Sequence, residues 1–351
     1  MPTVAVTVEQ LWRPQPGGIA TYVRGLLRGM SEVESSWQVV ALAPRAPGDG
    51  GVSVPLRRAP FSGRVLTRLW ATWPVGVPAN LDVLHATTLA GPFRGARRNS
   101  VALHDVLWRD EPTTSTRAGI AFHERRLRYV LEHEELTLIV TSPPLAARLV
   151  AEGVAPERVY CARMGVDDGV TPATSSATNA LLQAHGVDGP FTLYAGTREP
   201  RKNLSRLLEA HRAARAERPE LGPLVVVGPE GWGEAVPSDA VILGPQSRAQ
   251  LKGLLERASV FAYVPLNEGW GLPAVEALAL GTRVVVSATT PSTWDNETVV
   301  AVDPLDVARI AEGLVAALEA GDNEVAQQQR RDSVRALSWR ACAETHLAAW
   351  S

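Results

Sequence analysis

Short apolar runs of strand length recur along the chain, and segments with apolar residues at helical spacing separate many of them. Runs that predict buried strands cover residues 3–9, 37–43, 52–56, 82–88, 100–106, 136–142, 191–197, 223–232, 240–246, 259–266, 283–288 and 298–304. Helical patterns cover residues 62–73, 117–135, 143–153, 204–217, 247–258, 306–321 and 338–350. Strand runs with helices between them predict an α/β protein with parallel sheets.

The length of the chain indicates two domains. At 351 residues it exceeds what a single hydrophobic core usually organises. A stretch of small and polar residues at 171–180 predicts a linker or a surface segment. No apolar run reaches the length that spans a bilayer.

Composition is that of an ordinary soluble enzyme, with 45% hydrophobic and 21% charged residues. The net charge of −2 hides an asymmetry, because residues 1–166 carry +5 and the remainder carries −7. A basic half suits an anionic acceptor or an anionic membrane surface, although the dominance of arginine over lysine also reflects genomic bias. We expect no nucleic-acid partner. Cys161 and Cys342 lack metal-ligand spacing and no signal-peptide pattern begins the chain, so we expect a reducing cytoplasm.

The most informative stretch is NEGWGLPAVEALALG at residues 267–281, which lies between two strand-like runs. Pro273 suits the first turn of a helix, and Gly281 suits the position just after the last turn. A short helix between them is therefore predicted. The loop that precedes it would present unpaired amides together with the positive end of the helix dipole, which favours phosphate oxygens.

Two acids in this stretch, Glu268 and Glu276, are separated by eight positions. Glu268 is expected in the loop and Glu276 in the first helical turn, so both can face one ligand at the end of a sheet. Carboxylates accept hydrogen bonds from neutral hydroxyls, and no third acid or histidine stands nearby to complete a metal site. Polyol recognition therefore suits the pair better than metal binding. The alternative is that Glu276 only complements the helix dipole and Glu268 is a solvated loop acid.

A basic pair, Arg201 and Lys202, stands just before a predicted helix that Asn203 can cap. Exposed cations at a helix N-terminus oppose the dipole by roughly 0.3–1 kcal/mol each. Their placement is explained if an anion binds between them. The alternative is two solvated charges in a loop.

Two histidines, His85 and His104, fall near the carboxyl ends of predicted parallel strands, an edge at which polar groups point into a cleft. Each is either a ligand contact or a structural residue. A separate segment, residues 62–73, joins arginines to aromatic residues. It either lies on a membrane interface or packs as an ordinary helix with exposed arginine heads.

The stretch 267–281 resembles the E-x7-E region of retaining, nucleotide-sugar-dependent glycosyltransferases of the GT-B fold, the "group 1" family with many bacterial mannosyltransferases. The usual form is close to EGFGLPxxEAxAxGxPVVxS; Trp270 replaces its phenylalanine and Arg283 its late proline. The resemblance implies that Glu268 contacts the donor sugar and Glu276 the nucleotide ribose. It assigns the diphosphate to the loop residues Gly269, Trp270, Gly271 and Leu272.

Further motifs extend the resemblance over nearly the whole chain. The matching residues are Gly17 and Gly18 for a glycine loop that faces the donor diphosphate, Gly196, Arg201 and Lys202 for the diphosphate-binding basic loop, and His104 and Asp105 for an HD motif near the donor sugar and the acceptor. We place His85 on the acceptor side as well. Thr197 departs from the family, because many members carry an arginine there, and this leaves open which base neutralises which phosphate.

The resemblance implies two Rossmann-like domains facing across a cleft. Residues 1–168 would form the acceptor-side domain and residues 169–336 the nucleotide-sugar domain, with residues 337–351 as a last helix that crosses back to the first. A GVD tripeptide ending at Asp167 would lead into the linker.

The implied reaction transfers a hexose from a nucleoside diphosphate to an acceptor hydroxyl with retained configuration, without a metal and without a cofactor. The segments GTREPRKNL and LHDV most resemble bacterial mannosyltransferases and favour GDP-mannose, although UDP-sugar enzymes share these motifs. The acceptor would be a glycan, a lipid-linked or a small-molecule hydroxyl, with peripheral contact at the inner membrane surface as an option. The alternatives are a nucleotide-sugar 2-epimerase and a non-catalytic sugar-nucleotide-binding partner subunit.

Overall fold

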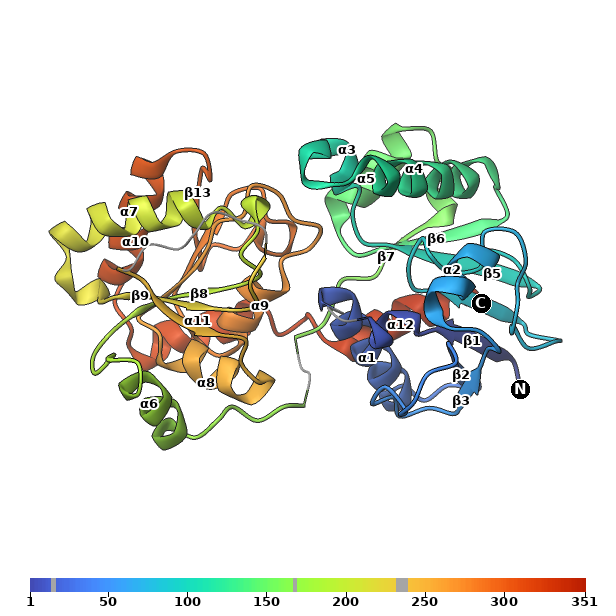
Figure 1. The fold of residues 1–351 in the computed structure, drawn as a ribbon, viewed down its shortest axis with the longest axis horizontal. Helices are drawn as coiled ribbons and strands as arrows, with labels where there is room; N and C mark the ends of the chain where they lie inside the picture. Colours follow the sequence, from blue (N-terminus) through green and yellow to red (C-terminus); the bar gives the residue numbers. More distant parts are fainter. Residues whose placement is uncertain (14–16, 167–168, 232–238) are drawn as a thin grey trace. The chain divides into compact units, whose positions relative to one another are not determined.

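The computed structural model describes residues 1–13, 17–166, 169–231 and 239–351, and Asp167 of the GVD tripeptide lies outside them. The chain forms two compact units. The first comprises Met1–Asp168 together with Leu337–Ser351, and the second comprises Gly169–Ala336. Each unit is a parallel sheet with helices packed against it (Figure 1), which confirms the predicted α/β class with two Rossmann-like domains.

The first unit has a seven-stranded sheet in the order β3-β2-β1-β4-β5-β6-β7. Because the chain runs outward from β1 to β3 and then restarts at β4, β1 lies between β2 and β4. Val6 of β1 pairs with Ala41 on one side and with His85 on the other. The strands are β1 Thr3–Thr7, β2 Gln38–Ala43, β3 Leu56–Arg58, β4 Val83–Ala86, β5 Arg98–Leu103, β6 Leu136–Val140 and β7 Val159–Cys161.

Helices cover this sheet according to the alternation of side chains along its strands. Ala86, Val101 and Leu138 point to the face that packs on α4 and α5, whereas the neighbouring residues His85 and Ser100 point to the opposite face. The helices of the first unit are α1 Gly17–Glu32, α2 Gly63–Leu69, α3 Leu107–Asp110, α4 Arg117–Glu132, α5 Pro143–Ala151 and α12 Trp339–Trp350, with 3-10 turns η1 Glu9–Trp12, η2 Pro112–Thr114 and η3 Pro156–Arg158.

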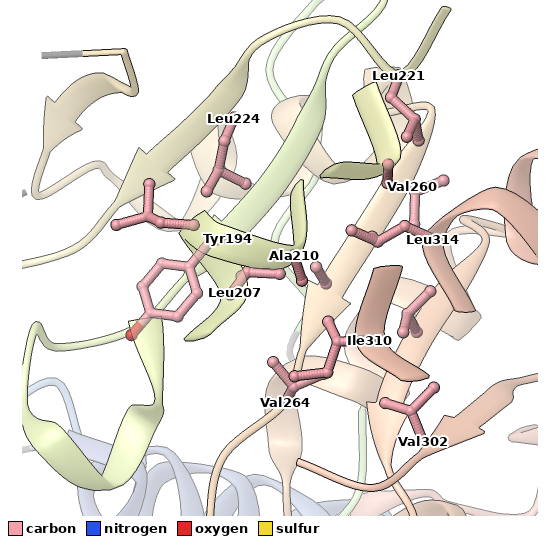
Figure 2. Packing of buried hydrophobic residues seen from close by; sticks show 14 of the residues in the cluster. Tyr194, Leu207, Ala210, Leu221, Leu224, Val260, Val264, Val302, Ile310 and Leu314 are labelled. Carbon is pink, nitrogen blue, oxygen red and sulfur yellow. The ribbon is translucent and has the colours of Figure 1, made fainter. Parts of the chain in front are cut away.

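The second unit has a six-stranded parallel sheet in the order β10-β9-β8-β11-β12-β13. Its strands are β8 Thr192–Ala195, β9 Leu224–Val227, β10 Val241–Gly244, β11 Val260–Tyr263, β12 Val284–Ser287 and β13 Val300–Val302. Its helices are α6 Ser175–Gln183, α7 Leu204–Glu217, α8 Arg248–Arg257, α9 Leu272–Ala279, α10 Val307–Glu319 and α11 Glu324–Ser333, with 3-10 turns η4 Pro200–Lys202, η5 Pro219–Leu221 and η6 Pro291–Thr293. Figure 2 shows the core between this sheet, α7 and α10, where Leu207 and Ile310 lie among strand residues such as Val260.

Residues 171–180 are a surface segment, one of the two alternatives expected, and most of them are exposed or half-buried. Helix α6 begins within them at Ser175, where the Thr174 hydroxyl accepts from the Ala177 amide at 3.2 Å. Alanine and leucine then continue the helix. The prediction of a strand at residues 52–56 is wrong in its bounds, because β3 occupies Leu56–Arg58 and shares only Leu56 with the predicted range.

Within segment 62–73, residues Gly63–Leu69 form α2, which packs as a helix of the first unit. Leu66 and Trp70 are buried in the core, while Val65 and Trp73 remain 41% and 66% exposed. Within the described residues, no helix has the length and apolar character needed to cross a bilayer.

The C-terminal helix α12 packs closely against α1 within the first unit. Trp339 is fully buried and packs against three glycines that leave no room for a side chain. A Cβ on Gly25 would lie 2.1 Å from the indole ring. A Cβ on Gly29 would lie 2.1 Å from the Trp339 carbonyl oxygen, and one on Gly165 would lie 2.3 Å from the Trp339 amide nitrogen. The adjoining amide of Val166 donates to the Leu337 carbonyl at 3.0 Å. Close packing at glycine therefore fixes α12.

A hydrogen-bond chain also ties α12 to the sheet. His346 on α12 places Nδ1 2.8 Å from the Cys342 carbonyl and Nε2 2.7 Å from the Tyr22 hydroxyl. A carbonyl only accepts, so Nδ1 of His346 carries the proton and Tyr22 donates to Nε2. Nε2 of His85 lies 3.1 Å from the same hydroxyl. Because Tyr22 has already used its proton, His85 donates through Nε2.

The other nitrogen of His85, Nδ1, is therefore an acceptor, and the Ser100 hydroxyl lies 2.9 Å from it. Ser100 in turn accepts from the indole N–H of Trp350 at 2.9 Å. Only neutral imidazoles satisfy every bond in this chain. Burial lowers the pKa of His85 well below its ordinary value and lowers the pKa of His346 to about 4.

Replacing Gly29 with alanine should destabilise the protein by about 1–3 kcal/mol or more, because the new Cβ meets backbone atoms that cannot move aside. Gly63→Ala is the matched control, since its Cβ would lie 3.9 Å from the nearest atom and the residue begins a helix. Denaturant unfolding of both variants measures the difference. Equal midpoints would contradict the close packing of α12.

The histidine chain predicts loss of stability in acid. The unfolded state takes up a proton on His346 near pH 6.5, whereas the folded state resists until about pH 4. The free energy of unfolding therefore decreases as the pH drops through this window, by roughly 3 kcal/mol for this residue. We expect His346→Gln to be less stable than the wild type at pH 7, with the difference shrinking towards pH 4. Denaturant unfolding at several pH values checks it, and a constant difference would refute it.

Candidate active site

The second sheet reverses its winding between β8 and β11, and the candidate site lies on the loops that follow these two strands. At such a point the two loops separate at the carboxyl edge of the sheet, which is where open α/β sheets bind ligands. The loop after β8 carries Arg201 and Lys202, and the loop after β11 carries Glu268. The structure thus brings three of the predicted site residues together.

Glu268 forms the centre of this group. Its Oε1 accepts short hydrogen bonds from Arg201 and from Lys202. Arg201 also donates to the Asn267 carbonyl at 2.9 Å and to Glu199 at 2.6 Å, and Lys202 donates to the Tyr263 hydroxyl at 3.2 Å. Two cations therefore face two carboxylates.

Electrostatics hold this group in its charged form. Burial alone would raise the pKa of Glu268, but the adjacent charges of Lys202 and Arg201 outweigh it and lower the pKa below the ordinary value. Burial likewise opposes the charge of Arg201, yet Glu268 and Glu199 raise its pKa. The basic pair is thus not solvated: its side chains are 19% and 14% exposed and already bonded to a carboxylate.

Asn203 does not cap α7 as expected. It adopts a left-handed conformation with φ 59°, and its side-chain amide donates to the carbonyls of Val264 at 3.0 Å and Pro304 at 2.7 Å. The side chain therefore fastens the basic loop to the edge of the sheet. Gly196, which opens this loop, donates to the Val227 carbonyl at 2.9 Å.

The glycine loop before α9 presents free backbone donors. In the described part of the chain, no hydrogen bond comes from the amides of Gly269, Trp270, Gly271 and Leu272. Gly271 precedes the helix with φ 101°, and a Cβ there would lie 2.4 Å from Thr290, so only glycine fits. Four free amides at a helix N-terminus can bind anionic oxygens.

The predicted helix is confirmed as α9, which ends before Gly281 in a left-handed conformation. Glu276, however, is the fifth residue of the helix and not part of its first turn, because the helix begins one residue earlier than expected. Its side chain is buried and forms a two-bond pair with Arg248, at 2.8 and 3.2 Å. Sequence reasoning missed Arg248, since nothing in the sequence joins the start of α8 to α9.

Trp270, where the family usually has phenylalanine, is 4% exposed. Its indole N–H has no hydrogen-bond partner among the residues the structure describes. Its carbonyl accepts from the Ser292 amide at 2.9 Å, which holds the loop against η6. The ring thus contributes packing, and its polar atom is free.

In the first unit, His104 and Asp105 follow β5. Nε2 of His104 donates to the Thr87 carbonyl at 2.9 Å, which leaves Nδ1 as an acceptor without a partner in the described residues. Burial lowers the pKa of His104, so the ring stays neutral. Asp105 accepts from the Leu107 amide at 3.1 Å. Gly17 and Gly18 begin α1 and are exposed.

The prediction that His85 faces an acceptor is wrong for this structure. His85 is fully buried, and both its nitrogens bond within the core, to Tyr22 and Ser100. The residue lies inside β4, one position before its end, and points to the face covered by α1 and α12. Its role is structural.

The chain is similar to known glycosyltransferases. Residues 182–332 match the model of the family described as glycosyl transferases group 1. The chain is 26% identical to the O-antigen chain mannosyltransferase B of Escherichia coli, over 74% of this chain and 71% of that protein. It is also 26% identical to the MMP alpha-(1->4)-mannosyltransferase of Mycolicibacterium hassiacum, over 95% of this chain and 94% of that protein.

Among solved structures, Anabaena HepE in complex with UDP-glucose is similar, with a TM-score of 0.73 and 16% identity over 99% of both chains. This likeness confirms the predicted GT-B fold.

Arg201→Ala should lower the free energy of unfolding by about 3–5 kcal/mol, because it leaves Glu268 and Glu199 buried with a single cation. Arg309→Ala is the control, since Arg309 pairs with Glu312 at 2.8 Å on the surface and should matter by less than about 1 kcal/mol. Denaturant unfolding compares the two. Similar small losses would show that the group around Glu268 is not held as described.

Proposed function

We propose that this chain, whose residues 182–332 match the family of group 1 glycosyl transferases, transfers a hexose from a nucleoside diphosphate sugar to an acceptor hydroxyl, with retained configuration. The observation that supports this best is the edge between β8 and β11. There, a buried carboxylate, two cations and four free amides combine acceptors for sugar hydroxyls with donors for a diphosphate.

In this proposal, binding of the donor changes the hydrogen-bond partners of Arg201, Lys202 and Glu268. The charges of Arg201 and Lys202 are balanced by Glu268 and Glu199, so the free amides before α9 supply the uncompensated positive field for the diphosphate. A bound diphosphate would draw Arg201 and Lys202 towards its oxygens and release Glu268 to accept from sugar hydroxyls. Negative charge that grows on the leaving diphosphate is then met by preorganised donors.

Retention would follow from attack on the same face as the leaving group, with a donor phosphate oxygen taking the acceptor proton. No residue is assigned as an enzymic nucleophile. The chain needs only to hold both substrates in position, which can supply much of the rate acceleration. Glu276, held by Arg248, would accept from the ribose hydroxyls and so bind the donor equally in the ground and transition states.

GDP-mannose is the favoured donor because two of the relatives are mannosyltransferases. A UDP-sugar is the second candidate, since a similar structure binds UDP-glucose. We further propose that no metal is required, since among the described residues no group of three metal-ligand side chains occurs. The chain would act in the cytoplasm, which suits its two unpaired cysteines, with the exposed Val65 and Trp73 available for peripheral membrane contact.

The experiment that tests the function is a donor panel of GDP-mannose, UDP-glucose and UDP-N-acetylglucosamine. We expect one donor to raise the unfolding temperature and to release its nucleoside diphosphate when acceptors are added, with the same rate in EDTA. Stabilisation by no donor would refute the proposal. Conversion of a donor alone into its 2-epimer would indicate an epimerase, and restoration by magnesium of activity lost in EDTA would reveal a metal site.

Replacement of Glu268 and of Glu276 by glutamine should change different kinetic constants. Glu276→Gln removes binding that ground and transition states share, so it should mainly raise the donor KM. Glu268→Gln removes a contact to the reacting sugar, so it should mainly lower kcat. It also frees Arg201 and Lys202, so the free nucleoside diphosphate should bind at least as tightly as to the wild type.

Calorimetry with the nucleoside diphosphate, set beside steady-state rates, decides between these assignments. Arg248→Ala should raise KM in the same direction as Glu276→Gln, whereas Arg257→Ala on the same helix should not. Loss of nucleotide affinity in Glu268→Gln, with retention in Glu276→Gln, would reverse the proposed orientation of the donor.

A further inference from the structure

Glu9 is a buried acid that the proposed reaction does not use. It begins η1, directly after β1, and is 3% exposed. Its Oε1 accepts from the Thr88 hydroxyl at 3.1 Å. Its Oε2 is inaccessible to solvent and has no hydrogen-bond partner among the described residues.

An acid in this position destabilises the protein that carries it. Removing a carboxylate from water without replacing its hydrogen bonds costs desolvation free energy. Burial raises the pKa of Glu9, and the hydrogen bonds and the charge of Arg13 offset this only in part. Unsatisfied buried groups are rare in folded proteins and often mark a site of function.

Glu9 lies at the edge of the first sheet where a ligand can bind. The first sheet reverses its winding between β1 and β4, and Glu9 follows β1 while Thr88 follows β4. This is the edge at which open α/β sheets bind ligands. In the second unit the equivalent edge holds Glu268, which is bonded to two cations, whereas the Glu9 carboxylate accepts from the Thr88 hydroxyl and forms no ion pair among the described residues.

A second polar atom without a partner belongs to the same edge. His104 follows β5, the next strand along, and its bare Nδ1 accepts but does not donate. Both free atoms, Oε2 of Glu9 and Nδ1 of His104, thus require hydrogen-bond donors. The nearby positive charge of Arg13 disfavours a cationic ligand, so the donors that fit are neutral hydroxyls.

We propose that Glu9 is an acceptor-binding residue, whose free oxygen accepts a hydrogen bond from a hydroxyl of a sugar acceptor, with His104 accepting from another. The inference rests on the proposed glycosyltransferase function and names the part of the first domain that holds its second substrate. Glu9 would position the acceptor and would make no contact with the nucleotide.

The test uses Glu9→Gln, with Glu34→Gln as the control because Glu34 is an exposed acid of the same domain. Calorimetry with methyl α-D-mannopyranoside, in the presence of saturating GDP, measures the acceptor subsite. We expect Kd for the pyranoside to rise about tenfold in Glu9→Gln and to stay unchanged in Glu34→Gln, with unaltered GDP affinity in both. Glu9→Asp, which keeps the charge but shortens the side chain by one methylene, should also weaken binding of the pyranoside.

Thermal unfolding provides a readout that a structural role would not give. Removal of an unsatisfied charge should raise the unfolding temperature of Glu9→Gln by about 2–4 °C. A lower unfolding temperature would show that Glu9 is a structural partner of Thr88 and would overturn the inference. So would an unchanged pyranoside affinity, or the absence of pyranoside binding to the wild type. If GDP and the other nucleotides fail to bind the wild type, the proposed function itself fails, which is a separate result.

Discussion

Both domains depend on the point at which a parallel sheet reverses its winding. Right-handed crossovers carry the chain outward from a central strand, and the next series must start on the other side of that strand. The loops after the two central strands therefore diverge, and backbone and side-chain polar groups gather between them. This happens between β1 and β4 in the first domain and between β8 and β11 in the second. The two acids Glu9 and Glu268 lie on the loops that follow β1 and β11 at these points.

The two reversal points are filled in opposite ways. In the second domain, Arg201 and Lys202 meet the charge of Glu268, so this edge is assembled before any ligand arrives. Such a buried group is not a source of net stability, since apolar replacements often do as well, but it fixes geometry. In the first domain, Oε2 of Glu9 and Nδ1 of His104 have no hydrogen-bond partner among the residues that the structure describes. At one edge the charged groups satisfy one another, and at the other two buried acceptor atoms lack partners within the part of the chain that the structure describes.

Local pattern predicted most of the fold and the central motif, because strand runs and helix ends are encoded within a few residues. The course of α9 between Pro273 and Gly281 is an example. The predictions were wrong where contacts with residues distant in sequence determine the role of a side chain. Asn203 reads as a cap but bonds to the edge of the sheet, and the start of α8 holds Arg248 next to Glu276, 28 residues away in sequence. His85 has the position of a site residue, and only strand alternation and the return of α12 make it part of the core.

Because residues 337–351 belong to the first domain, that domain can be completed only after the second domain has been synthesised. A ribosome releases α1 and β4 long before it makes α12, so the glycines that receive Trp339 and the imidazole of His85 wait uncovered while the second domain emerges. The second domain is continuous in sequence and can fold as a unit during that time. A chain that stops before Trp339 would lack α12 and would leave the face of α1 that carries Gly25 and Gly29 uncovered. Translation must therefore run past both domains before the first one is finished.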